Sequence, residues 1–176
     1  MPNWCSNELY IGIEADRDVA AITQQIKERC AGTVENGEET VLDFRNIVQP
    51  PDTPSYRDEP DQKTAKQNYD WWYNWNVKNW GTKWNSQGAR WSADDTVINF
   101  DTAWSPPLPI VLELSKLFED VVFALRYEEG GMAFAGDYVC VNGKVHFEHT
   151  RETLPWLDGI IDDALDELSK ARKTSE

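Results

Sequence analysis

The sequence holds few of the side chains that bind metals or carry out thiol and imidazole chemistry, with three cysteines and two histidines in 176 residues. Cys5, Cys30 and Cys140 are far apart and show no Cys-x-x-Cys spacing, which argues against a zinc site and favours a reduced, cytoplasmic protein. His146 and His149 fall on opposite faces of an extended strand, so one metal ion does not reach both. We therefore expect neither a metal nor a cofactor.

Long apolar runs and catalytic motifs are missing as well. No apolar run of about 18 residues occurs, which predicts that no segment spans a membrane. Residues 1–4 lack the basic and apolar regions of a secretory signal peptide. The sequence has no Gly-x-Ser-x-Gly motif, no phosphate-binding loop and no dinucleotide fingerprint, so we do not expect an enzyme.

Positive charge is scarce. The chain has 17 lysines and arginines against 31 aspartates and glutamates, which gives a net charge of −14. A protein that binds duplex DNA places lysine and arginine against the phosphates, so direct binding of duplex nucleic acid is not expected. The acidic surface has three interpretations: solubility, imitation of a nucleic-acid backbone, and binding of a divalent cation. No calcium-loop pattern supports the third.

Aromatic residues are plentiful and unevenly placed. With 40% hydrophobic and 12% aromatic residues, the chain has enough apolar surface for a core, which excludes global disorder. Residues 61–104 contain seven of the nine tryptophans and equal numbers, five each, of acidic and basic residues. An acidic body therefore carries a neutral, tryptophan-rich segment.

Hydrophobic periodicity predicts an α+β fold. Alternating apolar residues indicate strands over residues 7–13, 40–48 and 96–104, and residues 121–127 are predicted as a fourth strand. Apolar residues at spacings of three and four indicate a helix from the N-cap Asp16 to about Gly32, and another after the prolines of residues 106–109. This order is the split βαβ pattern of a ferredoxin-like antiparallel sheet with both helices on one face. We expect a single domain over residues 1–176.

Two additions accompany this pattern. A tryptophan-rich insertion at about residues 50–95, with a helix over residues 64–80, is expected between the second and third strands. A C-terminal extension at about residues 132–176 adds a hairpin, with a type I′ turn at Asn142-Gly143, and a last helix. Strict alternation would place four hairpin residues on one face: Tyr138, Cys140, Val145 and Phe147.

Three motifs give the chain a family resemblance. They are Met1-Pro2-Asn3-Trp4-Cys5-Ser6-Asn7, Asn79-Trp80-Gly81-Thr82-Lys83-Trp84 and Phe100-Asp101-Thr102-Ala103-Trp104-Ser105-Pro106-Pro107. With these motifs the chain resembles the YubB-like family of phage and plasmid proteins over residues 2–140. The resemblance implies a ferredoxin-like domain in a small cytoplasmic protein carried by mobile elements, and it implies no established activity.

The tryptophan-rich segment supplies the first candidate binding residues, and they have two interpretations. These residues are Trp75, Asn79, Trp80, Lys83 and Trp84. Their aromatic rings either tether the insertion to the core or form a surface for a protein or a stacked base. Lys83, near two tryptophans, is a candidate cation–π partner.

Asp101 and Trp104, at the end of the third predicted strand, are the second candidates. Alternation places Trp104 on the same face as Ile98 and Phe100. No carboxylate or histidine is adjacent in sequence to partner Asp101 in catalysis. Its position is more typical of a residue that fixes a turn by accepting hydrogen bonds from backbone or indole N–H groups.

The last helix supplies the third candidates. One side of this helix is apolar, and the other carries Asp162, Asp163, Asp166 and Glu167. Carboxylates spread along a helix can imitate the charge of a nucleic-acid backbone. Taken with the phage and plasmid origin that the YubB-like resemblance implies, we expect a non-enzymatic accessory protein of a phage or plasmid. It would bind a host protein, such as a nuclease or defence complex, and inhibit it by acidic DNA mimicry.

The alternative function is that of a ferredoxin-like binder of single-stranded nucleic acid, which stacks bases on tryptophan and tyrosine. Charge separates the two functions, because a single-strand binder needs a basic groove. The basic residues of the tryptophan-rich segment are Lys63, Lys66, Lys78, Lys83 and Arg90. They are balanced by an equal number of acidic residues, so the sequence alone favours acidic mimicry.

Overall fold

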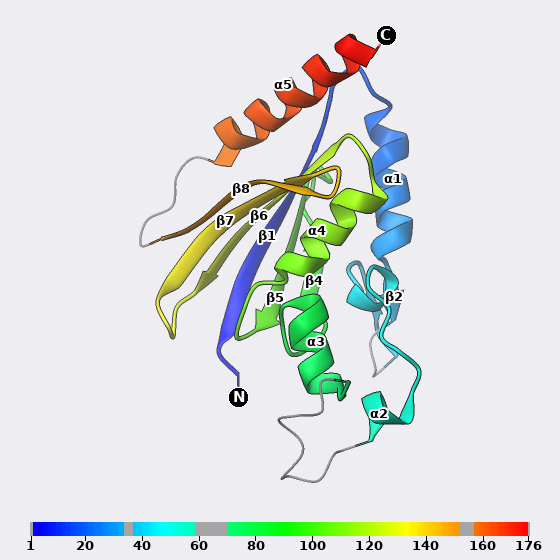
Figure 1. The fold of residues 1–176 in the computed structure, drawn as a ribbon, viewed down its shortest axis with the longest axis vertical. Helices are drawn as coiled ribbons and strands as arrows, with labels where there is room; N and C mark the ends of the chain where they lie inside the picture. Colours follow the sequence, from blue (N-terminus) through cyan, green and yellow to red (C-terminus); the bar gives the residue numbers. More distant parts are fainter. Residues whose placement is uncertain (1, 34–36, 59–69, 152–156, 176) are drawn as a thin grey trace.

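The computed structural model describes residues 2–33, 37–58, 70–151 and 157–175, and its main feature is a six-stranded antiparallel sheet (Figure 1). The strands follow the order β4-β5-β1-β6-β7-β8. They are β1 (Trp4–Ile13), β4 (Gln87–Trp91), β5 (Val97–Ala103), β6 (Val121–Glu129), β7 (Phe134–Val141) and β8 (Lys144–Arg151). The helices are α1 (Val19–Cys30), α2 (Pro54–Arg57), α3 (Trp72–Trp80), α4 (Leu108–Leu117) and α5 (Leu157–Ser175).

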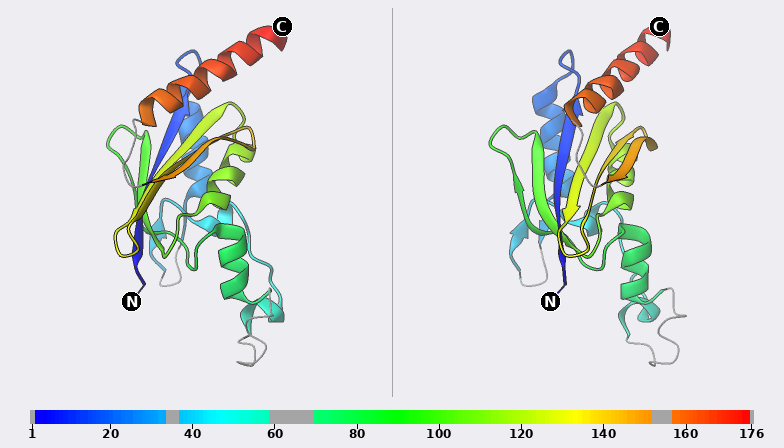
Figure 2. Two further views of the ribbon diagram at one scale, coloured as in Figure 1. Left: turned by 60° about the vertical axis from the view of Figure 1, so that its left-hand side comes forward. Right: turned by 90° about the vertical axis from the view of Figure 1, so that its left-hand side faces the viewer.

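Strands β4, β5, β1 and β6 have the ferredoxin-like arrangement that the sequence predicts. β1 lies between β5 and β6 and pairs with both in antiparallel register. Helix α1 follows β1 and helix α4 follows β5, and both lie on the same face of the sheet (Figure 2). β7 and β8 extend the sheet beyond β6. The α+β, ferredoxin-like fold class is therefore confirmed.

The prediction of a strand over residues 40–48 is wrong. Only β3 (Glu39–Thr40) is extended there, and it pairs with β2 (Gly32–Thr33) in a separate two-stranded sheet. The chain then turns through a 3-10 helix, η1 (Phe44–Asn46), because the Asp43 carboxylate accepts a hydrogen bond from the backbone N–H of Arg45. Leu42, Asp43 and Phe44 are all buried, so the alternation of apolar and polar residues does not separate an inner from an outer face.

The second strand of the ferredoxin pattern is instead β4, at the edge of the sheet beside β5. It lies within residues 50–95, which the sequence assigned to an insertion between the second and third strands. The additional segment therefore precedes β4 and connects it to α1. Ala89 and Trp91 alternate with Gly88 and Arg90, a signal too short to identify a strand beside so many tryptophans.

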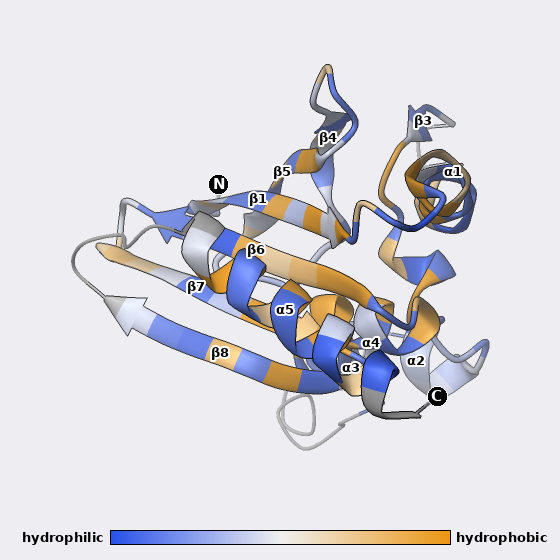
Figure 3. Ribbon diagram, turned by 90° about the horizontal axis from the view of Figure 1, so that it is seen from above, coloured by the Kyte–Doolittle hydropathy of each residue, from blue (hydrophilic) through white to orange (hydrophobic). Residues whose placement is uncertain are grey.

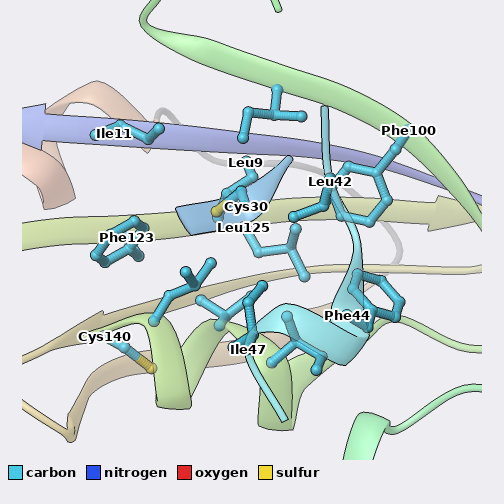
Figure 4. Packing of buried hydrophobic residues seen from close by; sticks show 14 of the residues in the cluster. Leu9, Ile11, Cys30, Leu42, Phe44, Ile47, Phe100, Phe123, Leu125 and Cys140 are labelled. Atoms are coloured by element: carbon cyan, nitrogen blue, oxygen red, sulfur yellow. The ribbon is translucent and has the colours of Figure 1, made fainter. Parts of the chain in front are cut away.

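The main hydrophobic core lies between the sheet and helices α1 and α4 (Figure 4). Leu9, Phe123 and Leu125 enter it from β1 and β6, Cys30 from α1, and Phe44 from η1. Burying a large apolar side chain of this kind stabilises the fold by about 1.5–3 kcal/mol. Because its Phe44 belongs to this core, η1 is anchored to the sheet.

Helix α5 covers the opposite face of the sheet, over β6 and β7 (Figure 3). Its Ala164 and Leu168 are buried in this second hydrophobic cluster, as the apolar stripe of the last helix predicts. Gly12 of β1 allows the close approach, because a Cβ atom there would lie 3.0 Å from Cγ2 of Ile161.

The C-terminal hairpin has the predicted turn, but one residue faces the other way. Asn142 and Gly143 have φ angles of 49° and 70°, and a type I′ turn requires both to be positive. An irregularity in the register between Val139 and Cys140 pairs Phe147 with Val139. Phe147 therefore packs on the α5 side of the sheet, whereas Cys140 belongs to the main core.

The helix boundaries differ slightly from the prediction. Asp18, rather than Asp16, is the N-cap of α1, and its carboxylate accepts a hydrogen bond of 3.0 Å from the N–H of Ala21. α3 begins at Trp72, and the start predicted near residue 64 lies outside the described residues. Among the helices that the structure describes, none has the length and apolar character needed to cross a membrane.

Candidate functional site

Helix α3 lies at the end of the sheet where the N-terminus is (Figure 1). An open hollow of about 800 Å³ is lined in part by residues of this helix. Five aromatic side chains line it: Trp4, Tyr56, Trp72, Trp80 and Trp84. Five polar side chains complete its wall: Arg45, Arg57, Asn76, Asn85 and Gln87. We call this site the aromatic hollow. Its residues come from separate parts of the chain, so the site exists only in the folded protein.

Trp4 and Trp84 form an accessible aromatic pair in this wall. Their ring centroids are 6.3 Å apart, and Trp4 is 42% exposed. The ammonium group of Lys83 lies 4.4 Å from the ring centroid of Trp84 and 5.9 Å from that of Trp72, within the range of cation–π contacts. Lys83 therefore brings a positive charge to the edge of the aromatic hollow.

Trp80 forms the buried floor, with only 3% of its surface exposed. Its indole Nε1 donates a hydrogen bond of 2.9 Å to the carbonyl of Val48. Its ring meets Phe44 and Trp75 edge to face, with centroid distances of 5.9 and 5.8 Å. Gly81 ends α3 with a φ of 81°, a conformation that favours glycine. These contacts fix the floor to the main core.

The buried amide of Asn76 joins the walls of the hollow. Its Oδ1 accepts a hydrogen bond of 3.0 Å from the hydroxyl of Tyr56, and its Nδ2 donates one of 2.9 Å to the carbonyl of Lys83. Tyr56 also meets the ring of Trp75 edge to face at 5.7 Å. Helices α2 and α3 and the loop after α3 are therefore held together without a ligand.

Arg45 is held in the wall by a buried carboxylate. Its Nη2 lies 2.7 Å from Oδ2 of Asp43, and the amide of Asn85 donates a hydrogen bond of 2.8 Å to Oδ1 of the same residue. Burial opposes ionisation of Asp43, but the hydrogen bonds from Arg45 and Asn85 outweigh it and hold the pKa of this carboxyl below its usual range. Asp43 is therefore ionised at neutral pH and keeps the guanidinium in place.

The aromatic hollow offers rings for stacking, amides for hydrogen bonding and guanidinium groups for anions. Within the described residues, no carboxylate or imidazole lines it. The same part of the chain contains no group of three or more metal-ligating side chains. Rings, amides and guanidinium groups together suit the binding of a flat, anionic ligand.

The structure divides the candidate residues of the tryptophan-rich segment between two roles. Trp80 and Trp84 line the hollow, with Lys83 beside them. Trp75 packs against Trp80, and Asn79 donates a hydrogen bond of 2.9 Å to the backbone carbonyl of Trp75. The tether interpretation therefore fits Trp75 and Trp80, while Trp84 fits the surface interpretation.

Asp101 and Trp104 lie elsewhere. Asp101 accepts a hydrogen bond of 3.0 Å from the Ser6 hydroxyl, where the sequence suggested a backbone or indole donor. The turn after β5 is instead fixed by Thr102, whose hydroxyl donates a hydrogen bond of 2.8 Å to the carbonyl of Ser105. Trp104 follows the end of β5 with a φ of 74° and is 43% exposed, so it does not continue the buried face as predicted.

The four acidic residues of the last helix form a separate surface. Asp162, Asp163, Asp166 and Glu167 are exposed on α5. α5 and α3 lie at opposite ends of the molecule (Figure 1). Glu167 lies 3.3 Å from Nδ1 of His146 on β8. This acidic surface therefore does not contribute to the aromatic hollow.

Several lining residues were not identified from the sequence. Arg45 lies in the segment predicted to be a strand, and Tyr56 and Arg57 lie in the predicted insertion before its helix. Asn85 was not singled out either. The sequence carries only a weak signal for Arg45, Tyr56 and Arg57. They are basic or aromatic residues in an acidic part of the chain, and no regular spacing relates them to the tryptophans.

Comparison with known proteins places the fold in a family. Among solved structures, the chain is similar to protein api92 from Yersinia pseudotuberculosis, with a TM-score of 0.50, 12% identity, and coverage of 89% of this chain and 100% of that chain. At this identity the likeness concerns the fold alone. No curated protein matches the sequence.

The family model of the ferredoxin-like domain in Api92-like protein matches residues 79–170, which includes most of the last helix. Because this match covers more than half of the chain, the protein belongs to the Api92-like family with a ferredoxin-like domain.

Proposed function

We propose that this protein is a non-catalytic binding protein and that its aromatic hollow binds single-stranded nucleic acid by stacking bases on tryptophan. One observation carries the proposal: Arg45 and Arg57, from outside the tryptophan-rich segment, line the same hollow as Trp84. The sequence argued against a single-strand binder because that segment has no net positive charge. Folding supplies the missing cations from elsewhere in the chain.

The aromatic part of the hollow suits bases. Trp4 and Trp84 are adjacent and accessible, and stacking of a base on an aromatic ring contributes about 1–3 kcal/mol. Stacking does not require a particular base, because every base has a flat π surface. Gln87, exposed at the edge of the hollow, offers an amide for hydrogen bonds to the edge of a base.

The charge in the hollow suits an anionic ligand in spite of the net charge of −14. Arg45 and Arg57 are in the wall, and Lys83 lies over Trp84. Within the described part of the chain, no acidic side chain lines the hollow. We therefore expect the affinity of the hollow for an anionic ligand to fall with added salt, as the affinity of phosphate contacts does.

A second candidate function rests on α5. One side of α5 is apolar and packs against the sheet. The exposed side carries four acidic residues: Asp162, Asp163, Asp166 and Glu167. This surface supports inhibition of a host nuclease or defence complex by acidic DNA mimicry, in an accessory protein of a phage or plasmid as the YubB-like resemblance implies. It ranks second because exposed carboxylates also serve solubility alone.

Fluorescence titration tests the first proposal. Single-stranded oligothymidine and oligoadenine, added at low salt, should quench tryptophan emission with micromolar or tighter affinity. Trp84→Ala should weaken binding by about tenfold, because about 1–3 kcal/mol of stacking is lost. Trp104→Ala is the control, since Trp104 is a tryptophan that is 43% exposed but lies outside the hollow. Equal affinity of the two variants, or no quenching by either oligonucleotide, would show that the hollow is not a base-binding site.

Charge reversal tests the second candidate. A variant with lysine at Asp162, Asp163, Asp166 and Glu167 is compared with the unchanged protein in an affinity pull-down at two salt concentrations. Mimicry requires that a nucleic-acid-handling partner is captured at low salt, elutes at high salt and is lost by the variant. If partner capture is unchanged in the variant but disappears in Trp84→Ala, the acidic side of α5 is a solvated surface.

A further inference from the structure

A second hollow adjoins the aromatic hollow and contains more arginine. It has a volume of about 550 Å³, and its wall includes Arg29, Arg45 and Arg57 together with Pro50 and Pro51. We call it the arginine groove. Arg45, Tyr56 and Arg57 line both hollows, so the two sites are adjacent and share a wall.

The arginine groove contains one more arginine than the aromatic hollow. Within the described part of the chain, three arginines line it and Asp52 is its one carboxylate. Asp52 pairs with Arg57. Arg29 projects from the last turn of α1 and is exposed. Three guanidinium groups around one groove stand out in a chain with 31 acidic residues.

The placement of Arg45 is what links the two sites. Asp43 holds it through both carboxylate oxygens, and it also donates a hydrogen bond to the carbonyl of Thr33. A guanidinium fixed in this way loses little conformational freedom when it binds an anion. The Nε and Nη2 groups of Arg45 already donate to Asp43 and Thr33, so Arg45 attracts a phosphate through its charge rather than through two parallel hydrogen bonds.

We propose that the arginine groove binds the backbone phosphates of the same single strand whose bases stack in the aromatic hollow. This inference rests on the proposed function and adds a second subsite to it. Arg45 and Arg57 stand at the junction, and Arg29 contacts a phosphate further along the strand. The ligand is therefore an oligonucleotide with a charged backbone, and a free nucleoside fills only the aromatic hollow.

The test uses two oligonucleotides and two variants. The first ligand is a six-nucleotide oligothymidine with normal phosphodiester links, and the second is its methylphosphonate analogue, whose backbone is uncharged. Arg29→Gln changes a residue that lines the arginine groove alone. Arg90→Gln is the matched control, because Arg90 is exposed on β4 and lines neither hollow. Both ligands are titrated by tryptophan fluorescence at several salt concentrations, and circular dichroism verifies the fold of each variant.

The phosphodiester ligand should bind about fivefold more weakly to Arg29→Gln than to the unchanged protein, as expected for one charge contact near the surface. The slope of log affinity against log salt should become shallower by about 0.7, the value for one phosphate contact of a single strand. The methylphosphonate ligand should still quench tryptophan emission, should bind more weakly overall, and should not distinguish Arg29→Gln from Arg90→Gln.

The possible failures are separable. Equal affinity for the two ligands, or an unchanged salt slope in Arg29→Gln, overturns the phosphate subsite while base stacking in the aromatic hollow stands. Absence of binding by both ligands overturns the stacking function and this inference together. Inorganic tripolyphosphate is the last probe. If it binds through Arg29 but does not compete with the phosphodiester strand, the groove is a separate anion site and the inference is wrong.

Discussion

Both carboxylate oxygens of Asp43 accept hydrogen bonds from the guanidinium of Arg45, which lies two residues further along the chain. Nε of Arg45 lies 2.9 Å from Oδ1 and 3.1 Å from Oδ2, and Nη2 lies 2.7 Å from Oδ2. The Asp43 side chain is 4% exposed, whereas that of Arg45 is 38% exposed. A buried anion therefore positions a partly exposed cation at the junction of the two hollows.

The first prediction concerns this pair. Asp43→Asn should lower the free energy of unfolding at pH 7 by about 2 kcal/mol, because hydrogen bonds to a charged group are replaced by weaker ones. The effect should depend on pH. The pKa of Asp43 is lowered by folding from an ordinary value of 3.8, so its stabilisation is present above that value and is lost as the pH falls through the folded pKa.

Urea unfolding at pH 7 and at steps below pH 4 measures this difference. The gap between the unchanged protein and Asp43→Asn should shrink as the pH falls below about 4. Asp163→Asn, on the exposed side of α5, is the control and should have little effect at any pH. A gap that stays constant across the pH range would contradict the prediction.

The second prediction concerns the end of α3. Gly81 and Gly88 have positive φ angles of 81° and 60°, so alanine is strained at both positions, by about 1 kcal/mol. At Gly81 an added Cβ would also lie 2.7 Å from Cδ of Pro109, whereas at Gly88 it would meet nothing within 4 Å. Gly81→Ala should therefore destabilise the protein more than Gly88→Ala. Thermal unfolding compares them, and equal losses would mean that the contact with Pro109 relaxes without cost.

The third prediction concerns the docking of α5. Gly12→Val places branched carbons where a single Cβ would already lie 3.0 Å from Cγ2 of Ile161 and 3.2 Å from Cβ of Val122. We expect α5 to lose part of its contact with the sheet, and hydrogen exchange of its amides to become faster. Leu168→Ala, which removes a buried side chain of α5, should act in the same direction and cost about 2–3 kcal/mol. Unchanged exchange in both variants would show that α5 is held mainly by other contacts.

The fourth prediction concerns the thiols. Burial raises the pKa of Cys5 and Cys30 to about 12 and that of Cys140 to about 11. The thiolate is the reactive form, so the folded protein should react very slowly with a thiol reagent at pH 8. In denaturant all three thiols should react at once. Rapid modification of one thiol in the folded protein would show that the core around this cysteine opens to solvent.

Local patterns in the sequence predicted much of the fold. The alternation in β1 and β5, the apolar run of β6, the apolar stripes of α1, α4 and α5, and the Asn142-Gly143 turn each depend on residues close together in the chain. The failures occur where burial comes from distant partners. Residues 40–48 alternate like a strand, yet Asp43 is buried there because Asn85 and Arg45 satisfy its carboxylate. Phe147 changes face because a register irregularity interrupts the alternation.

The candidate site shows the same division. The sequence by itself determined that aromatic residues concentrate between residues 61 and 104 and that this segment is neutral. Only the tertiary structure decided which rings are accessible and which cations accompany them. It brings Trp4, Arg45 and Arg57 to the tryptophans of α3 and its following loop. Charge along a chain can be counted from the sequence, but the field at a site depends on distances in space, and those are set by the packing of η1 and α3 against the core.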